Sequence, residues 1–93
     1  MTDSSVDGLA GWVQVDDSLR ATFRTSDFVS GLAFVNRVGE AAEAANHHPD
    51  ITLTYSSVSI TTTSHDVGGL TSRDFDLARS ITLIAAELGL VAD

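Results

Sequence analysis

Apolar and polar residues alternate in the stretch that follows Gly11, and this period of two is typical of half-buried β-strands. The alternating runs at residues 12–15 and 19–24 are separated by Asp-Asp-Ser, which are turn-forming residues. In the longer run every second residue is apolar and would share one face of a sheet: Leu19, Ala21 and Phe23. The pattern predicts an antiparallel hairpin over residues 12–24.

The same alternation returns after the chain's one proline. Residues 51–55 and 58–63 alternate apolar residues with Thr or Ser and are rich in β-branched side chains, which favour strands. Ser56 and Ser57 lie between the two runs. We therefore expect a second hairpin here.

Between the hairpins, apolar residues recur every three or four positions, which indicates an amphipathic helix. Ser26 is a good N-cap, and Asp27 lies where the helix dipole favours an anion. Pro49 ends the helix, because the residue before a proline is disfavoured in the α region. The helix is expected from Asp27 to Asn46 or His47. The apolar face consists of Phe28, Leu32, Val35, Val38, Ala42 and Ala45.

A second helix is predicted after a connection at residues 66–70, whose two adjacent glycines suggest a flexible turn. Thr71 followed by Asp74 resembles a capping box with Asp in place of Glu. Gly89 suits the position after the helix end. The apolar face here consists of Phe75, Ala78, Ile81, Ala85 and Leu88.

The order of elements is two strands, a helix, two strands and a helix, after a loose start with one short helical turn near residues 6–10. This order predicts a single α+β domain over residues 1–93, with a four-stranded antiparallel sheet and both long helices packed on one face.

Composition narrows the possible functions. The formal net charge of −8 argues against nucleic-acid binding, which needs a basic surface. The absence of cysteine excludes disulfides and cysteine-based zinc sites. The polar, acidic N-terminus is unlike a signal peptide, and no apolar run is long enough to cross a membrane. A cytoplasmic protein without a membrane partner is expected.

All three histidines lie between positions 47 and 65, at predicted ends of elements, where sites on small folds are usually built. His47 and His48 end the first helix, and His65 ends a strand. Glu43 lies four residues before His47, so its carboxylate could orient or charge that imidazole.

Three segments carry a resemblance to a known family. They are Glu43-Ala44-Ala45-Asn46-His47-His48-Pro49, then Val58-Ser59-Ile60, then the segment from Ser64-His65-Asp66 through Gly68-Gly69 to Arg73-Asp74. An acidic residue four positions before His-His-Pro, with a third histidine 17 residues after the second, is a specific signature. Together they resemble the pterin-4a-carbinolamine dehydratases over roughly residues 9–88.

The resemblance implies an α+β fold and a homodimer or homotetramer. It also implies dehydration of 4a-hydroxytetrahydrobiopterin to quinonoid dihydropterin, which recycles the cofactor of aromatic amino acid hydroxylases. No cofactor of the enzyme's own is implied. The implied active-site histidines are His47, His48 and His65. The implied substrate-binding or supporting residues are Glu43, Pro49, Arg73 and Asp74.

Histidine suits this chemistry. Dehydration needs one proton delivered to the leaving 4a-hydroxyl and another removed from a ring nitrogen, and an imidazole with a pKa of about 6.5 can do either. Our hypothesis makes His47 and His65 the acid–base pair and His48 mainly a pterin-binding residue. A shared metal is disfavoured, because adjacent helical residues point about 100° apart.

Simpler roles remain open for the same residues. His47 and His48 could form a solvated helix end, Asp74 could act as a cap, and Arg73 and Glu43 could be surface residues. The family usually has an aromatic residue where this chain has Ile51, and some members have Asp where it has Asn46. A non-catalytic pterin-binding or protein-dimerisation module on the same fold is therefore the alternative, followed by a stabilising subunit for an unrelated partner.

Overall fold

The computed structural model describes residue 9 and residues 11–92, and for His65 it describes the backbone but not the side chain. The helical turn expected near residues 6–10 lies outside the described residues, apart from Leu9. Leu9 is buried in the core.

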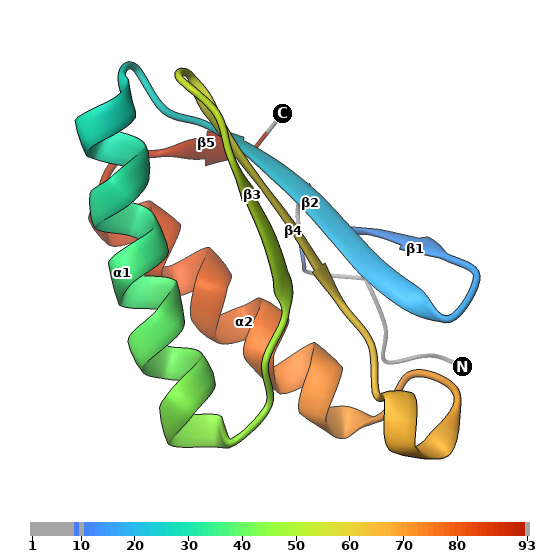
Figure 1. The fold of residues 1–93 in the computed structure, drawn as a ribbon. Helices are drawn as coiled ribbons and strands as arrows, with labels where there is room; N and C mark the ends of the chain where they lie inside the picture. The colour runs from blue at the N-terminus through green and yellow to red at the C-terminus, as the bar shows by residue number, and fades with distance from the viewer. Residues whose placement is uncertain (1–8, 10, 93) are drawn as a thin grey trace.

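The chain folds into one antiparallel sheet with two long helices on the same face (Figure 1). Strand order across the sheet is β1-β2-β4-β3, and β5 also pairs with β2. The α+β class is thus confirmed, with one more strand than expected. The elements are β1 (Val13–Val15), β2 (Ser18–Arg24), α1 (Phe28–Ala45), β3 (Asp50–Leu53), β4 (Ser57–Thr62), the 3-10 helix η1 (His65–Val67), α2 (Ser72–Glu87) and β5 (Val91–Ala92).

Both predicted hairpins form, and the central pair β2–β4 joins them. Ala21 lies opposite Ile60 and Phe23 opposite Val58, so the apolar faces of the two strands coincide. Side chains alternate across a strand, so Ser57, Ser59 and Thr61 of β4 lie on the opposite face from Val58 and Ile60. Thr62 therefore shares the inner face with Ile60.

The short strand β5 was not predicted, because two residues are too few to show an alternating pattern. Ala92 pairs with Phe23 on the edge of β2 that β1 leaves uncovered. Gly11 passes so close to Ala92 that a Cβ at position 11 would lie 2.2 Å from the alanine Cβ, and its φ is 91°. Glycine is needed there on both counts.

Helix α1 begins and ends differently from the prediction. Asp27, not Ser26, is the N-cap, and its carboxylate accepts the Ser30 N–H at 2.8 Å. The helix ends at Ala45 because Asn46 adopts the left-handed conformation with φ of 52°. The N–H groups of Asn46 and His47 then bond back to Glu43 and Ala42, as in a Schellman motif. His47 and His48 consequently lie beyond the helix.

Helix α2 matches its predicted signals. Thr71 and Asp74 form the expected capping box, and Gly89, with φ of 73°, follows the helix end. The connection predicted to be flexible contains η1 and a β-bridge between Ser64 and Gly69. Both features place the start of α2 beside the end of β4.

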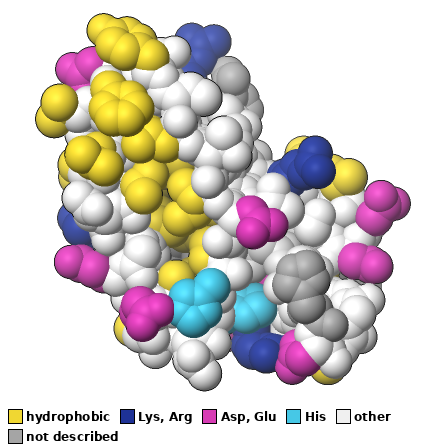
Figure 2. All heavy atoms as spheres, viewed as in Figure 1, with side chains coloured by type: hydrophobic (Ala, Val, Ile, Leu, Met, Phe, Trp, Pro, Cys, Tyr) yellow, Lys and Arg dark blue, Asp and Glu magenta, His cyan; other side chains and the backbone are white. Residues whose placement is uncertain are grey.

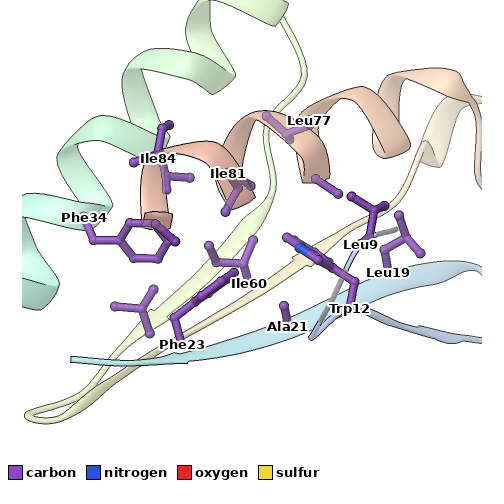
Figure 3. Close-up of a cluster of buried hydrophobic side chains, with 14 residues drawn as sticks. Leu9, Trp12, Leu19, Ala21, Phe23, Phe34, Ile60, Leu77, Ile81 and Ile84 are labelled. Carbon is purple, nitrogen blue, oxygen red and sulfur yellow. The ribbon is translucent and has the colours of Figure 1, made fainter. Parts of the chain in front are cut away.

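The core lies between the sheet and the helices (Figure 3). Phe23 packs edge-on against Phe34 with ring centroids 5.1 Å apart, and against Trp12 at 6.2 Å. Trp12 is buried in this core, and its indole N–H donates to Thr82 at 2.9 Å. Each large apolar side chain buried here stabilises the fold by about 1.5–3 kcal/mol. Among the described residues, no helix has the length and apolar character needed to span a bilayer.

Candidate active site

The centre of the site is a buried pair formed by His47 and Asp74. The left-handed turn at Asn46 directs His47 beneath the start of α2, where only 8% of the residue is exposed. Its Nε2 lies 2.7 Å from Oδ1 of Asp74, which is fully buried. Two residues that are 27 positions apart in sequence are therefore joined by a hydrogen bond shielded from water.

Asp74 accepts four hydrogen bonds, two on each oxygen. Oδ1 accepts from His47 and from the Thr62 hydroxyl at 2.7 Å. Oδ2 accepts from the Ser64 hydroxyl at 2.6 Å and the Thr71 N–H at 3.0 Å. Burial alone raises the pKa of Asp74, but the bonds from Ser64, His47, Thr62 and Thr71 outweigh it and hold the pKa below its ordinary value. Asp74 therefore stays ionised at neutral pH, and it both caps α2 and holds His47.

Glu43 pairs with His48 and not with His47, contrary to the expectation. The His48 Nε2 lies 2.5 Å from the Glu43 Oε2. The i,i+4 prediction assumed that the helix continued through His47, but the turn at Asn46 rotates His47 inward and brings His48 over the last helical turn. Both side chains of this pair are exposed. Figure 2 shows the two described histidine side chains at one end of the molecule, with acidic side chains nearby.

Pro49 connects this turn to β3, which starts at Asp50. It is half-buried, and its ring disfavours the α conformation at His48, the residue before it. Ile51, the position where the family usually has an aromatic residue, packs partly buried against the core. Position 51 thus contributes an aliphatic side chain and no aromatic ring.

Arg73 is engaged in holding η1. Its Nη2 donates to Asp66 Oδ1 at 2.8 Å, and its Nε donates to the Thr71 hydroxyl at 3.3 Å. The hydrogen bond from Arg73 holds the pKa of Asp66 below its ordinary value. Arg73 therefore ties the N-terminus of α2 to the segment that begins with His65.

His65 does not end a strand as predicted: β4 ends at Thr62, and the backbone of His65 starts η1 directly after Ser64, whose hydroxyl binds Asp74. Adjacent Cα atoms are about 3.8 Å apart, so the His65 backbone lies close to the Asp74 network. Its side chain is outside the described part of the chain, so convergence of the three imidazoles stays a prediction.

Sequence reasoning missed Thr62 and Ser64. The signal was present: they continue the inward-facing series of Val58 and Ile60, yet they are polar. A hydroxyl on a buried face needs a hydrogen-bond partner, which here is Asp74.

Two of the surface hollows are lined by described residues. The larger, about 980 Å³, lies at the far end of the sheet between Ser26, Ser57 and Leu90. The smaller, about 330 Å³, lies between the β1–β2 turn, Thr63 and Gly68, beside the segment that contains His65. Over the described residues, no three His, Cys, Asp or Glu side chains converge as a metal site would require.

The chain resembles known proteins over most of its length. Residues 2–84 match the model of the family described as pterin 4 alpha carbinolamine dehydratase. A protein of Thermosynechococcus vestitus, provisionally named a pterin-4-alpha-carbinolamine dehydratase, is 45% identical over 83 residues, covering 89% of this chain and 87% of that protein. A protein of Trichormus variabilis with the same provisional name is 46% identical over 81 residues, covering 87% of each.

Solved structures share the fold. The transcriptional coactivator/pterin dehydratase of Brucella melitensis superposes with a TM-score of 0.82 at 29% identity, covering 86% of this chain and 87% of that one. A pterin dehydratase-like protein described as a RuBisCO assembly factor of the α-carboxysome superposes with a TM-score of 0.65 at 19% identity, covering 80% and 86%, which is a likeness of fold alone. On the sequence matches, the chain belongs to the pterin-4-alpha-carbinolamine dehydratase family.

Proposed function

We propose that the chain is an active dehydratase that converts 4a-hydroxytetrahydrobiopterin to quinonoid dihydropterin and water. The proton on N5 is removed, the C4a–O bond breaks as the hydroxyl takes up a proton, and the N5 electron pair forms the C4a=N5 bond. No electrons are exchanged with a redox partner. The step needs one proton acceptor and one proton donor held on a single substrate.

The observation that supports this proposal best is the buried His47–Asp74 pair. An ionised carboxylate on Nε2 stabilises the imidazolium that forms when His47 accepts a proton, as the Asp of a hydrolase triad does for its histidine. His47 is thus suited to take the N5 proton. The family resemblance adds His65 as the partner that protonates the leaving hydroxyl.

His48 is proposed to bind the pterin, with Glu43 fixing its ring. Its exposed position at the surface fits contact with a ligand that enters from solvent. Arg73 contributes indirectly, through η1, to the placement of His65. A dimer or tetramer, and a place beside an aromatic amino acid hydroxylase, are expectations drawn from the family.

The test follows the loss of carbinolamine ultraviolet absorbance in stopped flow, against the spontaneous reaction. We expect His47→Ala and His65→Ala each to lower kcat by roughly 100-fold or more, with a much smaller change in pterin affinity. Near-normal kcat in both variants would overturn the assignment of these roles.

The alternative is a non-catalytic pterin-binding or dimerisation module. Ile51 favours it, because its half-buried aliphatic side chain offers no ring on which a pterin could stack. Pterin binding measured by calorimetry without any acceleration of dehydration would select the module. Absence of both binding and acceleration would select a role toward another protein.

A further inference from the structure

The inner face of β4 changes from apolar to polar at its C-terminal end. Val58 and Ile60 are fully buried in the core, and Thr62 and Ser64 follow on the same face with 1% and 0% exposure. A hydroxyl removed from water costs free energy unless it is hydrogen-bonded. Neither residue is explained by packing alone.

The hydroxyls form two arms that reach Asp74, one from Thr62 at the end of β4 and one from Ser64 just after it. Thr62 donates to Oδ1, the oxygen that also binds His47. Ser64 donates its single proton to Oδ2, so the Thr71 hydroxyl, 2.9 Å away, must donate to Ser64. Thr71 in turn accepts from the Arg73 N–H at 3.2 Å. The second arm is thus a chain of donors that runs in one direction, and such chains strengthen each bond within them.

We propose that Thr62 and Ser64 are positioning residues, whose hydroxyls fix the Asp74 carboxylate so that it holds His47 with the proton on Nε2 and leaves Nδ1 to exchange protons with the substrate. A carboxylate held only by His47 and one backbone N–H could rotate about its Cβ–Cγ bond. With a side-chain donor on each oxygen, Thr62 at the end of β4 and Ser64 just after it, one orientation of the carboxylate satisfies all four bonds.

The charges around His47 are consistent with this role. Asp74 is the carboxylate that is hydrogen-bonded to its ring, and Nδ1 has no hydrogen-bond partner within the described part of the chain. Asp66 also acts on His47 from η1, but its charge is paired with Arg73, and Glu43 is paired with His48. The catalytic part of this proposal rests on the proposed function. The position of the proton on the His47 ring does not depend on it.

The direct test is the ¹⁵N spectrum of histidine-labelled protein without substrate, at a pH where His47 is neutral. We expect the wild-type protein to show His47 with the proton on Nε2. In Thr62→Val with Ser64→Ala, a mixture of the two tautomers is expected. Thr62→Ser keeps the hydroxyl and should keep the wild-type tautomer. Thr61→Val, on the opposite face of β4, is the matched control and should change nothing.

Kinetics give a second readout. Loss of one hydrogen bond to a charged group corresponds to roughly 10-fold, so we expect kcat to fall roughly 10-fold in Thr62→Val and roughly 100-fold in the double variant, with KM within about twofold. Thr62→Ser should restore most of kcat. If the double variant does not fold, Thr62→Val against Thr62→Ser supplies the same comparison.

A wild-type tautomer and wild-type kcat in folded Thr62→Val and double variants would overturn the proposal. So would a KM increase with unchanged kcat, since that would assign the hydroxyls to substrate binding. If wild-type protein does not dehydrate the carbinolamine, the proposed function fails. The tautomer spectra still decide the positioning role.

Discussion

His47 and His48 are consecutive in the chain and each pairs with a carboxylate, yet the two pairs have little in common beyond their chemistry. In the His47–Asp74 pair, 9% and 0% of the side chains are exposed, whereas in the His48–Glu43 pair the values are 58% and 78%. One pair connects two parts of the core and shares a four-donor network. The other lies on the last turn of α1 in contact with solvent. The left-handed conformation of Asn46 turns the chain at the end of α1, so that His47 is buried and His48 stays exposed.

Burial gives different roles to two pairs of similar chemistry. An exposed ion pair contributes about 0–1 kcal/mol and is screened by salt. Removing one partner of a buried pair costs about 3–5 kcal/mol, because the other charge is left without compensation. The buried pair is therefore the more constrained of the two, which suits the proton transfer proposed for His47.

The largest effect is expected from Asp74→Asn. Each Asp74 oxygen accepts two donors, and the amide that replaces one oxygen would point its own N–H groups at two of them. We expect a loss of about 2–4 kcal/mol in the free energy of unfolding and a fall of roughly 100-fold in kcat. Urea denaturation and stopped flow measure the two. Unchanged stability of the variant would contradict an ionised Asp74 carboxylate that accepts four hydrogen bonds.

The acid dependence of stability is the second expected effect. The pKa of folded Asp74 lies below its ordinary value of 3.8, so its contribution is fully present above that pH. The contribution is lost as the pH falls from 3.8 through the lowered folded value. Urea midpoints between pH 6 and pH 2 should therefore fall less steeply in Asp74→Asn than in wild type.

Asp27 provides a control for this acid dependence. Its pKa is also lowered, by the hydrogen bond from the Ser30 N–H, but it is exposed at the N-cap of α1. Asp27→Asn keeps an N-cap acceptor and should change the slope less. Equal slopes in wild type and Asp74→Asn would contradict a lowered pKa of the buried Asp74 carboxyl.

A smaller effect is expected at Asn46, whose left-handed conformation ends α1 just before His47. Asn46→Ala places a residue with little tolerance for positive φ at 52°, which should cost about 1 kcal/mol. Asn46→Gly should be nearly neutral, because glycine adopts this conformation readily. Thermal or urea unfolding distinguishes them. Similar stabilities of the Ala and Gly variants would contradict a left-handed turn here.

The smallest effect is expected from Glu43→Gln. The variant removes the charge beside His48 and keeps a hydrogen-bonding side chain of equal size. We expect less than about 0.5 kcal/mol in stability and a KM increase of roughly two- to fivefold at unchanged kcat. A fall in kcat as large as that of Asp74→Asn would contradict the difference between the pairs.

The regular elements were predictable because their patterns are local. The alternation of Leu19, Ala21 and Phe23 and the capping box of Thr71 and Asp74 are each encoded within a few residues, and the structure confirms them. β5 could not be foreseen, since Val91 and Ala92 form a strand only because the edge of β2 is available.

Sequence reasoning named some residues of the candidate site but not the partners that the structure gives them. The motif drew attention to Glu43, His47 and Asp74, yet helical spacing paired Glu43 with the wrong histidine. That error came from one backbone conformation at Asn46, which asparagine tolerates but does not require. Thr62 and Ser64 bind Asp74 across a tertiary contact between the end of β4 and the start of α2, which no local pattern encodes.

The most direct measurement compares His47→Gln with His48→Gln in the carbinolamine assay, with folding of both verified by circular dichroism. We expect His47→Gln to lose kcat by roughly 100-fold at similar KM, and His48→Gln to raise KM with kcat within a few-fold of wild type. Equal losses of kcat in the two variants, or the reverse order, would contradict the assignment of proton transfer to the buried pair.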